Sequence, residues 1–405
     1  MKQTQIFRDF RKYIGFSVFE MVCISVYVIA DTFFIALALG SDGLAALNIS
    51  IVSFTVIHSA GLMIGIGGAT RYAIMKAQRK DAGDVFTHAL YLGAAASLLF
   101  VIIGLVFVVP VSAALGADAD TIDMVVDYNR TMLLFSPLLI VKNIMLAFVR
   151  NDNNPKLAMA GTLTGAAMNI MLDVLFLFPL SLGMFGAALA TGLSLLASVM
   201  VLSLHFATGR SQFGLKRCRI RIKQCYKMIT LGISPFISEL TIAISLTIFN
   251  LVILNISGNV GVAAYGVVAN LAIVVLSIFT GVALGAQPLL SHAYGRKDLN
   301  AMTTIMKYAL TTVTVLAMLV YVFVFFNAAA ISGWFDNNSG DMFVSLASGG
   351  LRIYFIGVIF AGINIVTAAF FSATNRPVQG MFVSFSRGIV FIIPFEFPHF
   401  IKATC

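Results

Sequence analysis

Apolar runs of about 20 residues recur along almost the whole chain, and they restrict the fold more than any other feature. A helix of this length crosses the hydrocarbon core of a bilayer, which is about 30 Å thick. Only 11% of the residues are charged, whereas soluble domains carry about 25%. We therefore predict an all-α polytopic membrane protein with about eleven spans joined by short connections. The spans are predicted near 14–39, 46–75, 86–109, 125–149, 157–178, 184–206, 228–256, 262–292, 303–326, 343–371 and 378–395.

Among the loops, Lys and Arg occur only in alternate ones, which predicts the orientation of the chain. The largest basic cluster is the segment 210–227, and the N-terminal residues before the first span are also basic. The intervening loops lack Lys and Arg, namely 40–45, 110–124, 179–183, 257–261 and 327–342. Because basic loops stay in the cytoplasm, the N-terminus and the central loop are predicted to be cytoplasmic. The central cluster is first of all a topology signal; contact with anionic lipid is the second interpretation and nucleic acid a remote one.

The second half of the sequence repeats the first. The segment GSDGLAA (40–46) matches GNVGVAA (258–264), and RKD occurs at both 79–81 and 296–298. Later matches are offset by 222 residues, as with Pro155 and Pro377. A repeat of six spans returns the chain to its starting side, so the halves are parallel and a transport pathway is expected between them. The predicted lobes are 1–209 and 228–405, joined by the basic cytoplasmic linker 210–227.

The end of the chain departs from this repeat. At the same offset Cys405 corresponds to Gly183, which leaves no counterpart of the sixth span. We therefore expect two pseudo-symmetric six-helix lobes, the second without its last helix. A truncated or frame-shifted C-terminus and a natural eleven-span variant both explain this pattern.

Two carboxylates lie in the middle of predicted spans, where a central Asp costs roughly 2.5 to 3.5 kcal/mol. Asp31 is in the first span and Asp173 in the fifth, within GAAMNIMLDVLFLF. Asn169 precedes Asp173 by one helical turn, and Tyr27 precedes Asp31 in the same way. Carboxylate, amide and phenol oxygens suit Na⁺ or a proton relay. The competing interpretations are a plain interhelical hydrogen bond for the Asn–Asp pair and packing for Tyr27.

The repeat predicts a single ion site, in the N-terminal half. Phe391 and Phe395 occupy the positions that match Asn169 and Asp173, and Phe249 matches Asp31. Glu239, in the seventh span, is a weaker candidate for contact with a cationic substrate.

The sequence contains no motif of an enzyme. It has no phosphate-binding glycine loop ending in GK[ST], no metal-binding pair of histidines and no nucleophile elbow. We predict a non-enzymatic protein without a cofactor, whose energy comes from an ion gradient. The four cysteines and five histidines predict neither a disulfide nor a metal centre.

Three long stretches resemble the MATE (multidrug and toxic compound extrusion) transporters, especially the bacterial drug exporters. They are VYVIADTFFIALALGSDGLAALNIS, VRNDNNPKLAMAGTLTGAAMNIMLDVLFLF and GVALGAQPLLSHAYGRKD. The resemblance runs from about residue 12 to 393 and implies alternating access, with organic cations exported in exchange for Na⁺ or H⁺ across a bacterial inner membrane. It also implies an N-lobe cation site, formed by Asp31, Asn169, Asp173, Thr191, Tyr27 and Asn143.

We therefore expect a multidrug antiporter, most simply a monomer. Members of this family usually have twelve helices, so the C-terminus departs from their pattern. The alternatives are a lipid or polysaccharide-precursor flippase of the same superfamily and an inactive truncated product. Flippases tend to place basic residues in the central cavity, so Lys142 is the residue that favours the flippase.

Overall fold

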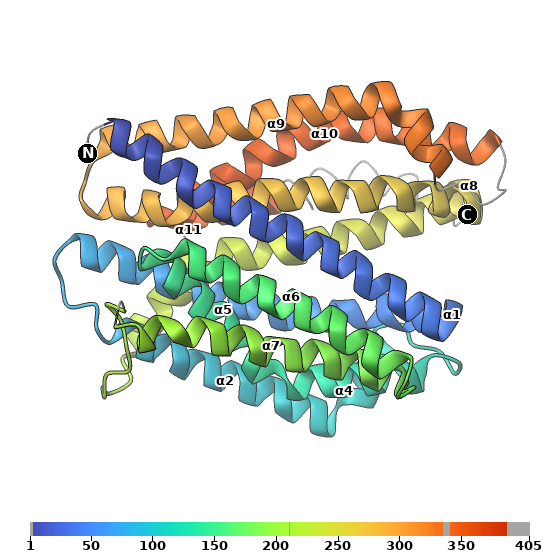
Figure 1. Ribbon diagram of the computed structural model, residues 1–405, viewed down its shortest axis with the longest axis horizontal. Helices are drawn as coiled ribbons and strands as arrows, with labels where there is room; N and C mark the ends of the chain where they lie inside the picture. The colour runs from blue at the N-terminus through green and yellow to red at the C-terminus, as the bar shows by residue number, and fades with distance from the viewer. Residues whose placement is uncertain (1–2, 210, 335–340, 387–405) are drawn as a thin grey trace. The chain divides into compact units, whose positions relative to one another are not determined.

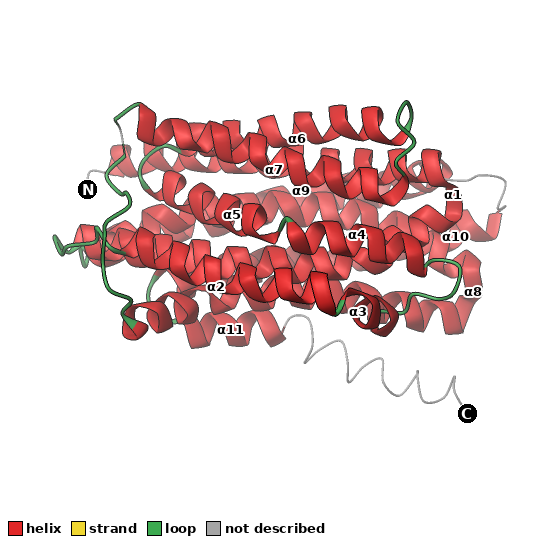
Figure 2. Ribbon diagram, turned by 90° about the horizontal axis from the view of Figure 1, so that it is seen from below, coloured by secondary structure: helices red, strands yellow, loops and turns green. Residues whose placement is uncertain are grey.

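The computed structural model describes residues 3–209, 211–334 and 341–386, and every regular element among these residues is helical (Figures 1 and 2). The all-α polytopic fold class predicted from the sequence is confirmed. The helices are α1 (Gln3–Ala77), α2 (Val85–Val106), α3 (Val108–Ala114), α4 (Ile122–Leu134), α5 (Ser136–Asn151), α6 (Pro155–Leu177), α7 (Gly183–Ala207), α8 (Ile222–Gly295), α9 (Leu299–Trp334), α10 (Asp341–Ala373) and α11 (Pro377–Phe385).

Helices α1 and α8 are each long enough for two passes through a bilayer. The 75 residues of α1 would extend about 110 Å as one straight helix, several times the thickness of a hydrocarbon core. The chain instead turns back at Gly40, whose φ of 68° and ψ of −153° are outside the helical region (Figure 1). Only glycine adopts such a conformation at little cost. Helix α8, with 74 residues, covers both predicted spans 228–256 and 262–292.

The predicted span 125–149 consists of two helices instead of one. Helices α4 and α5 meet at Phe135 with a bend of 51°. Pro137, in the first turn of α5, has no N–H to donate to the preceding turn and its ring crowds that turn, so a straight helix breaks here. Among the described residues seven helices are long and apolar enough to span a membrane, or eight with this bent pair.

The last predicted span, 378–395, begins as α11 and continues beyond the described residues. Phe391 and Phe395, the predicted counterparts of the polar pair in the fifth span, also lie outside the described residues.

The chain divides into two compact units. Unit 1 contains 1–21, 237–290 and 299–405, and unit 2 contains 22–236 and 291–298. The predicted lobe boundaries stay a prediction. The units follow the same order but exchange three segments, the start of α1, the start of α8 and the residues 291–298 around the end of α8.

Glycines explain the exchange of the start of α1 and of the start of α8. In unit 1 a methyl group on Gly285 would lie only 2.9 Å from Cα of Ile14, so the start of α1 packs directly on this part of α8. In unit 2 a methyl group on Gly232 would lie 1.9 Å from the carbonyl oxygen of Met63. Only glycine permits backbones to approach this closely.

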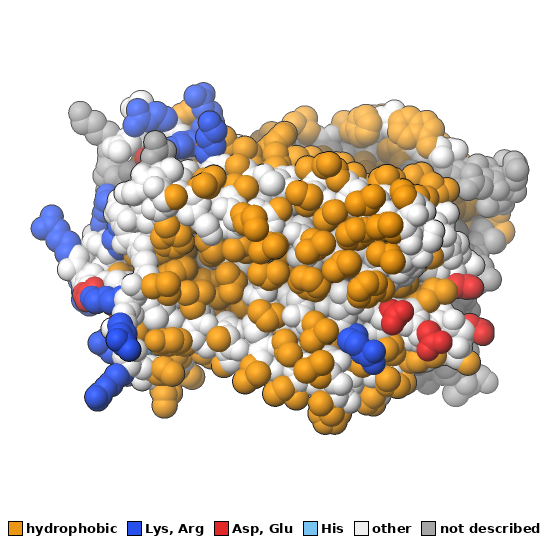
Figure 3. All heavy atoms as spheres, turned by 60° about the horizontal axis from the view of Figure 1, so that its bottom comes forward, with side chains coloured by type: hydrophobic (Ala, Val, Ile, Leu, Met, Phe, Trp, Pro, Cys, Tyr) orange, Lys and Arg blue, Asp and Glu red, His pale blue; other side chains and the backbone are white. Residues whose placement is uncertain are grey.

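The surface of unit 2 is divided by charge along its helices. On the face that includes α2 and α4, hydrophobic side chains cover the middle. Most Lys and Arg side chains gather at one end, and most Asp and Glu side chains at the other, where one basic side chain lies beside them (Figure 3). Helices α2 and α3 together connect the loop with Arg79 and Lys80 to the loop with Asp118 and Asp120. This is the pattern of a membrane protein whose apolar belt separates two differently charged ends.

Candidate functional site

Asp31 and Asp173 face each other inside unit 2. Asp31 comes from the first pass of α1 and Asp173 from α6, and their carboxyl groups are close enough to hydrogen-bond when one carries a proton. Asp173 is fully buried. Neither of its oxygens, nor Oδ1 of Asp31, receives a hydrogen bond from a described protein group. Two facing carboxylates without donors require a proton or a cation between them.

Asn169 supplies another oxygen acceptor, one helical turn from Asp173 on α6. Its Nδ2 donates a hydrogen bond to Oγ1 of Thr191 on α7 at 3.3 Å. Its Oδ1 is buried and receives no hydrogen bond from the described residues. Helices α6 and α7 can approach closely because Gly165 has no side chain. A methyl group at this position would lie 3.2 Å from the Ser194 carbonyl oxygen.

Two tyrosines complete this polar cluster. The hydroxyl groups of Tyr27 and Tyr128 both lie within electrostatic range of the two carboxylates. The Tyr128 hydroxyl also lies beside that of Thr191. Tyr128, which is 5% exposed on α4, is absent from the residues predicted from the sequence. A tyrosine costs little in a span, so composition gave no signal for it.

Asn143 has its described contacts elsewhere in unit 2. Its Nδ2 lies 3.2 Å from Nδ1 of His58 and 3.3 Å from the His58 carbonyl oxygen. A methyl group on Gly61 would lie 2.7 Å from the same Nδ2. Asn143 therefore fastens α5 to the second pass of α1, and its predicted part in the cation site stays a prediction.

Unit 1 holds a cavity of about 650 Å³ between α8 and α10, and its lining is mostly apolar. Phe249, Tyr265 and Tyr354 supply aromatic surface, with the rings of Phe249 and Tyr265 stacked at 5.6 Å. Thr241 and Ser245 supply hydroxyl groups. Phe249 is the residue that the repeat matches with Asp31, so equivalent positions serve a polar cluster in one unit and an apolar cavity in the other. Glu239 also belongs to unit 1, one residue after Ser238, whose hydroxyl donates to that of Ser384 at 2.7 Å.

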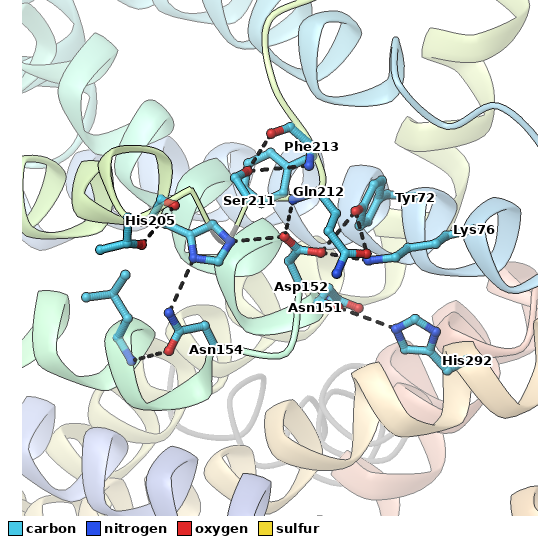
Figure 4. A network of polar contacts seen from close by, with 12 residues as sticks. Tyr72, Lys76, Asn151, Asp152, Asn154, His205, Ser211, Gln212, Phe213 and His292 are labelled. Carbon is cyan, nitrogen blue, oxygen red and sulfur yellow. Dashed lines mark hydrogen bonds and ion pairs between the residues drawn. The ribbon is translucent and has the colours of Figure 1, made fainter.

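A second buried carboxylate in unit 2, Asp152, has the opposite environment (Figure 4). It accepts four hydrogen bonds, from Lys76 Nζ at 2.7 Å, the Gln212 amide at 2.7 Å, the Tyr72 hydroxyl at 3.0 Å and His205 Nε2 at 3.0 Å. Burial alone raises the pKa of Asp152, but the hydrogen bonds from Lys76, Gln212 and His205 outweigh it and hold the pKa below its usual value.

The proton position on His205 follows from its neighbours. The Asn154 side-chain oxygen accepts from the Leu157 amide, so its NH₂ group faces Nδ1 of His205 at 3.3 Å. Nδ1 is therefore an acceptor and Nε2 carries the proton that it donates to Asp152. The Asp152 cluster is a satisfied structural junction, unlike the cluster around Asp173.

The oxygen donors of the Asp31–Asp173 cluster suit a hard cation or a proton better than a transition metal. Within the described residues no group of three His, Cys, Asp or Glu side chains could hold a metal ion. The cluster offers four buried oxygen atoms as ligands, one from Asp31, two from Asp173 and one from Asn169. Such an all-oxygen set is typical of sites for hard cations.

Known proteins resemble the chain over most of its length. The multidrug export protein MepA of Staphylococcus aureus is 23% identical over 376 residues, which cover 92% of this chain and 82% of the relative. The MATE multidrug transporter DinF-BH superposes with a TM-score of 0.87 at 24% identity, covering 96% of this chain and 87% of the other. A transporter of the MOP superfamily from Pyrococcus furiosus superposes with a TM-score of 0.88 at 20% identity, covering 100% and 91%.

The MatE family also matches the chain directly, over residues 17–175 and 235–397. These two segments fall in the two halves of the internal repeat and together span most of the chain. The chain therefore belongs to the MatE family of membrane transporters.

Proposed function

We propose that this protein is a secondary active transporter that exports organic cations in exchange for Na⁺ or H⁺. The observation that carries the proposal is the set of four buried oxygen acceptors on Asp31, Asp173 and Asn169 without donors among the described residues. In a span such groups persist when they bind a transported cation or proton. MepA, which is named a multidrug export protein, and DinF-BH, a multidrug transporter, supply the drug class.

The coupling follows from charge repulsion between Asp31 and Asp173. When both are ionised, the facing carboxylates disfavour close packing of α1 against α6. A bound Na⁺, or a proton on one carboxyl group, removes this repulsion and favours the closely packed arrangement. Alternating access requires two such arrangements with different affinities for the drug.

The aromatic cavity in unit 1 is the proposed chamber for the apolar part of the drug. Its volume of about 650 Å³ is in the range of small-molecule sites. Phe249, Tyr265 and Tyr354 provide ring faces that suit planar organic cations. Glu239 is a weaker candidate for contact with the positive charge of the drug.

The proposed location is a bacterial inner membrane, with the N-terminus and the segment 210–227 in the cytoplasm. The support is the basic character of alternate loops together with the charge division on unit 2 (Figure 3).

A flippase for lipid or polysaccharide precursors is the alternative function. It is favoured by Lys142, which lies within electrostatic range of His58 in unit 2. The Pyrococcus furiosus transporter is described as having a binding pocket of reverse polarity, which suggests a different function for that protein. The cluster of Asp31 and Asp173 has the polarity that selects a cation, which favours drug export here.

The test is efflux of a fluorescent organic cation from a drug-sensitive bacterial host. Asp31→Asn and Asp173→Asn should each abolish efflux driven by a Na⁺ or pH gradient, because an amide cannot exchange charge with the coupling ion. Asp123→Asn, which removes an exposed carboxylate at the start of α4, should leave efflux unchanged.

Normal efflux by both site variants, at matched expression, would refute the ion-coupling proposal. If the unmodified chain exports no cation under either gradient, it is an inactive product or a flippase. Proteoliposomes with a labelled lipid precursor separate these two, since only a flippase moves the precursor.

A further inference from the structure

The segment between α7 and α8 is fastened to unit 2 along its length. We call residues 211–223 the central strap; its first part has no regular secondary structure and it ends in the first turn of α8. The Gln212 amide donates to Asp152, the Lys216 amide to Thr87 Oγ1 at 2.9 Å, and the Arg221 amide to His88 Nε2 at 3.0 Å. Three backbone donors bound to side chains of α2 and the α5 end fix the path of the strap.

An aromatic anchor holds the same segment. Phe213 is 5% exposed, and its ring centroid lies 4.8 Å from that of Phe86 and 5.3 Å from that of Phe148. The Asp152 junction lies directly beside this ring, as Figure 4 shows. The strap is therefore part of the folded unit, and its backbone presents the exposed side chains at defined points on the surface.

The exposed side chains of the central strap are aliphatic and basic in alternation. Leu215 is 79% exposed, Ile220 65% and Ile222 82%. Arg217 and Arg219 are exposed between Leu215 and Ile220, and Lys223 is exposed directly after Ile222. The segment 210–227 contains no Asp or Glu. Exposure of three large aliphatic residues in one short segment indicates a surface that something apolar covers.

Acidic residues of unit 2 neutralise only part of this charge. Lys216 pairs with Asp81 at 2.9 Å and Arg221 with Asp84 at 3.3 Å. In the described part of the chain, Arg217, Arg219 and Lys223 have no acidic partner within ion-pair distance. The strap therefore presents uncompensated positive charge next to exposed aliphatic side chains.

The central strap lies against α2, a membrane-spanning helix. The Tyr91 hydroxyl lies 3.5 Å from the Cys218 carbonyl oxygen. Tyr91 is six residues after the start of α2 and so about 9 Å along that helix. Aliphatic side chains at this level reach the boundary between headgroups and acyl chains, where interfacial segments typically insert by about 5–10 Å.

We propose that the central strap is a binding surface for anionic phospholipids. Leu215, Ile220 and Ile222 contact the upper acyl chains, while Arg217, Arg219 and Lys223 bind the phosphate and the anionic headgroup. Charge complementarity selects anionic over zwitterionic lipid. The alternating aliphatic residues favour a membrane over nucleic acid, which offers no acyl boundary to cover them. This inference is independent of the transported substrate.

The test uses tryptophan fluorescence, because Trp334 is the only tryptophan of the chain. In a Trp334→Phe background, Ile222→Trp places a reporter on the strap. The full chain is reconstituted in phosphatidylcholine vesicles that contain an equal fraction of either brominated phosphatidylglycerol or brominated phosphatidylcholine. Bromine quenches tryptophan only at close range, so stronger quenching by the anionic lipid is the expected result.

Charge variants separate selective binding from simple proximity. Each basic residue near an anionic surface contributes about 1 kcal/mol, or about fivefold in relative affinity. Arg217→Gln with Arg219→Gln should therefore reduce the preference by more than fivefold, whereas Arg217→Lys with Arg219→Lys should keep it. Arg296→Gln with Lys297→Gln removes the same charge from another exposed loop and should leave the preference intact.

Equal quenching by the two brominated lipids would overturn the proposal, as would the absence of quenching by both. Binding of a single-stranded RNA probe that depends on Arg217 and Arg219, without a lipid preference, would assign the surface to nucleic acid instead.

Discussion

Asp152 and Asp173 are both buried carboxylates of unit 2, yet their surroundings give them different roles. Asp152 accepts four hydrogen bonds, whereas neither oxygen of Asp173 accepts one from the described residues. A saturated carboxylate stabilises one fixed arrangement. A carboxylate that accepts no hydrogen bond from the protein remains able to bind a ligand. The hydrogen-bond partners of a residue therefore distinguish structure from function where composition does not.

We predict that Asp152→Asn lowers the free energy of unfolding by about 3 kcal/mol at neutral pH, because Lys76 loses its buried partner. The pKa of Asp152 in the folded state lies below the ordinary value of 3.8. Its contribution is therefore present above pH 3.8 and is lost as the pH falls through the lower folded value. Unfolding in detergent, followed at neutral pH and in acid, should show the difference from the unmodified protein shrink in acid.

Asp120→Asn, on an exposed loop, is the control and should change stability at neither pH. A difference between Asp152→Asn and the unmodified protein that stays constant into acid would contradict the assigned ion pair.

At the scale of elements, the break between α4 and α5 positions part of the candidate site. Phe135 occupies the break, and its ring packs against Gly192 of α7. Gly192 follows Thr191, which lies beside Tyr128 of α4. The bend thus brings the Tyr128 hydroxyl and the Thr191 hydroxyl into the same cluster as the carboxylates.

We predict that Gly192→Ala destabilises the protein by about 1–3 kcal/mol and reduces ion-driven efflux. The new methyl group would lie 2.6 Å from the Phe135 ring, so α4 must move away from α7. Gly266→Ala is the matched control, because a methyl group there has no neighbour within 4 Å. Thermal unfolding and cation efflux provide the two measurements. Equal behaviour of the two variants would show that the close contact at Gly192 is dispensable.

The sequence predicted the spans and the two central acids for one physical reason. A bilayer imposes long apolar runs and makes exceptions such as Asp31 and Asp173 costly, so both leave a strong signal. Tyr128 leaves none, because a phenol is tolerated in a span. The sequence also did not predict that the central strap packs against unit 2, because a basic linker is normally solvated. The anchoring role of Phe213 depends on partners that are distant in the sequence.

At the scale of the whole molecule, duplication has produced two units with different chemistry. The position of Asp31 in unit 2 corresponds to that of Phe249 in unit 1, where it lines the apolar cavity. A polar cluster in one unit and an aromatic cavity in the other match the two requirements of an ion-coupled exporter, a site for the ion and a chamber for the drug. The different residues at matching positions of the repeat thus reflect the proposed division of function between the two units.

The orientation of the molecule in the membrane follows from its loops and can be measured directly. Lys80 is exposed in the basic loop before α2, and Ala119 is exposed in the acidic loop after α3. Moving the basic loop across the membrane would work against both the positive-inside bias and the membrane potential, which is worth about 2.3 kcal/mol per charge per 100 mV. We therefore predict that Ala119→Cys reacts with a membrane-impermeant maleimide added to intact cells, whereas Lys80→Cys reacts only after the cells are opened. The four native cysteines are first replaced by serine. Labelling of Lys80→Cys in intact cells would invert the orientation and place the central strap on the outer leaflet.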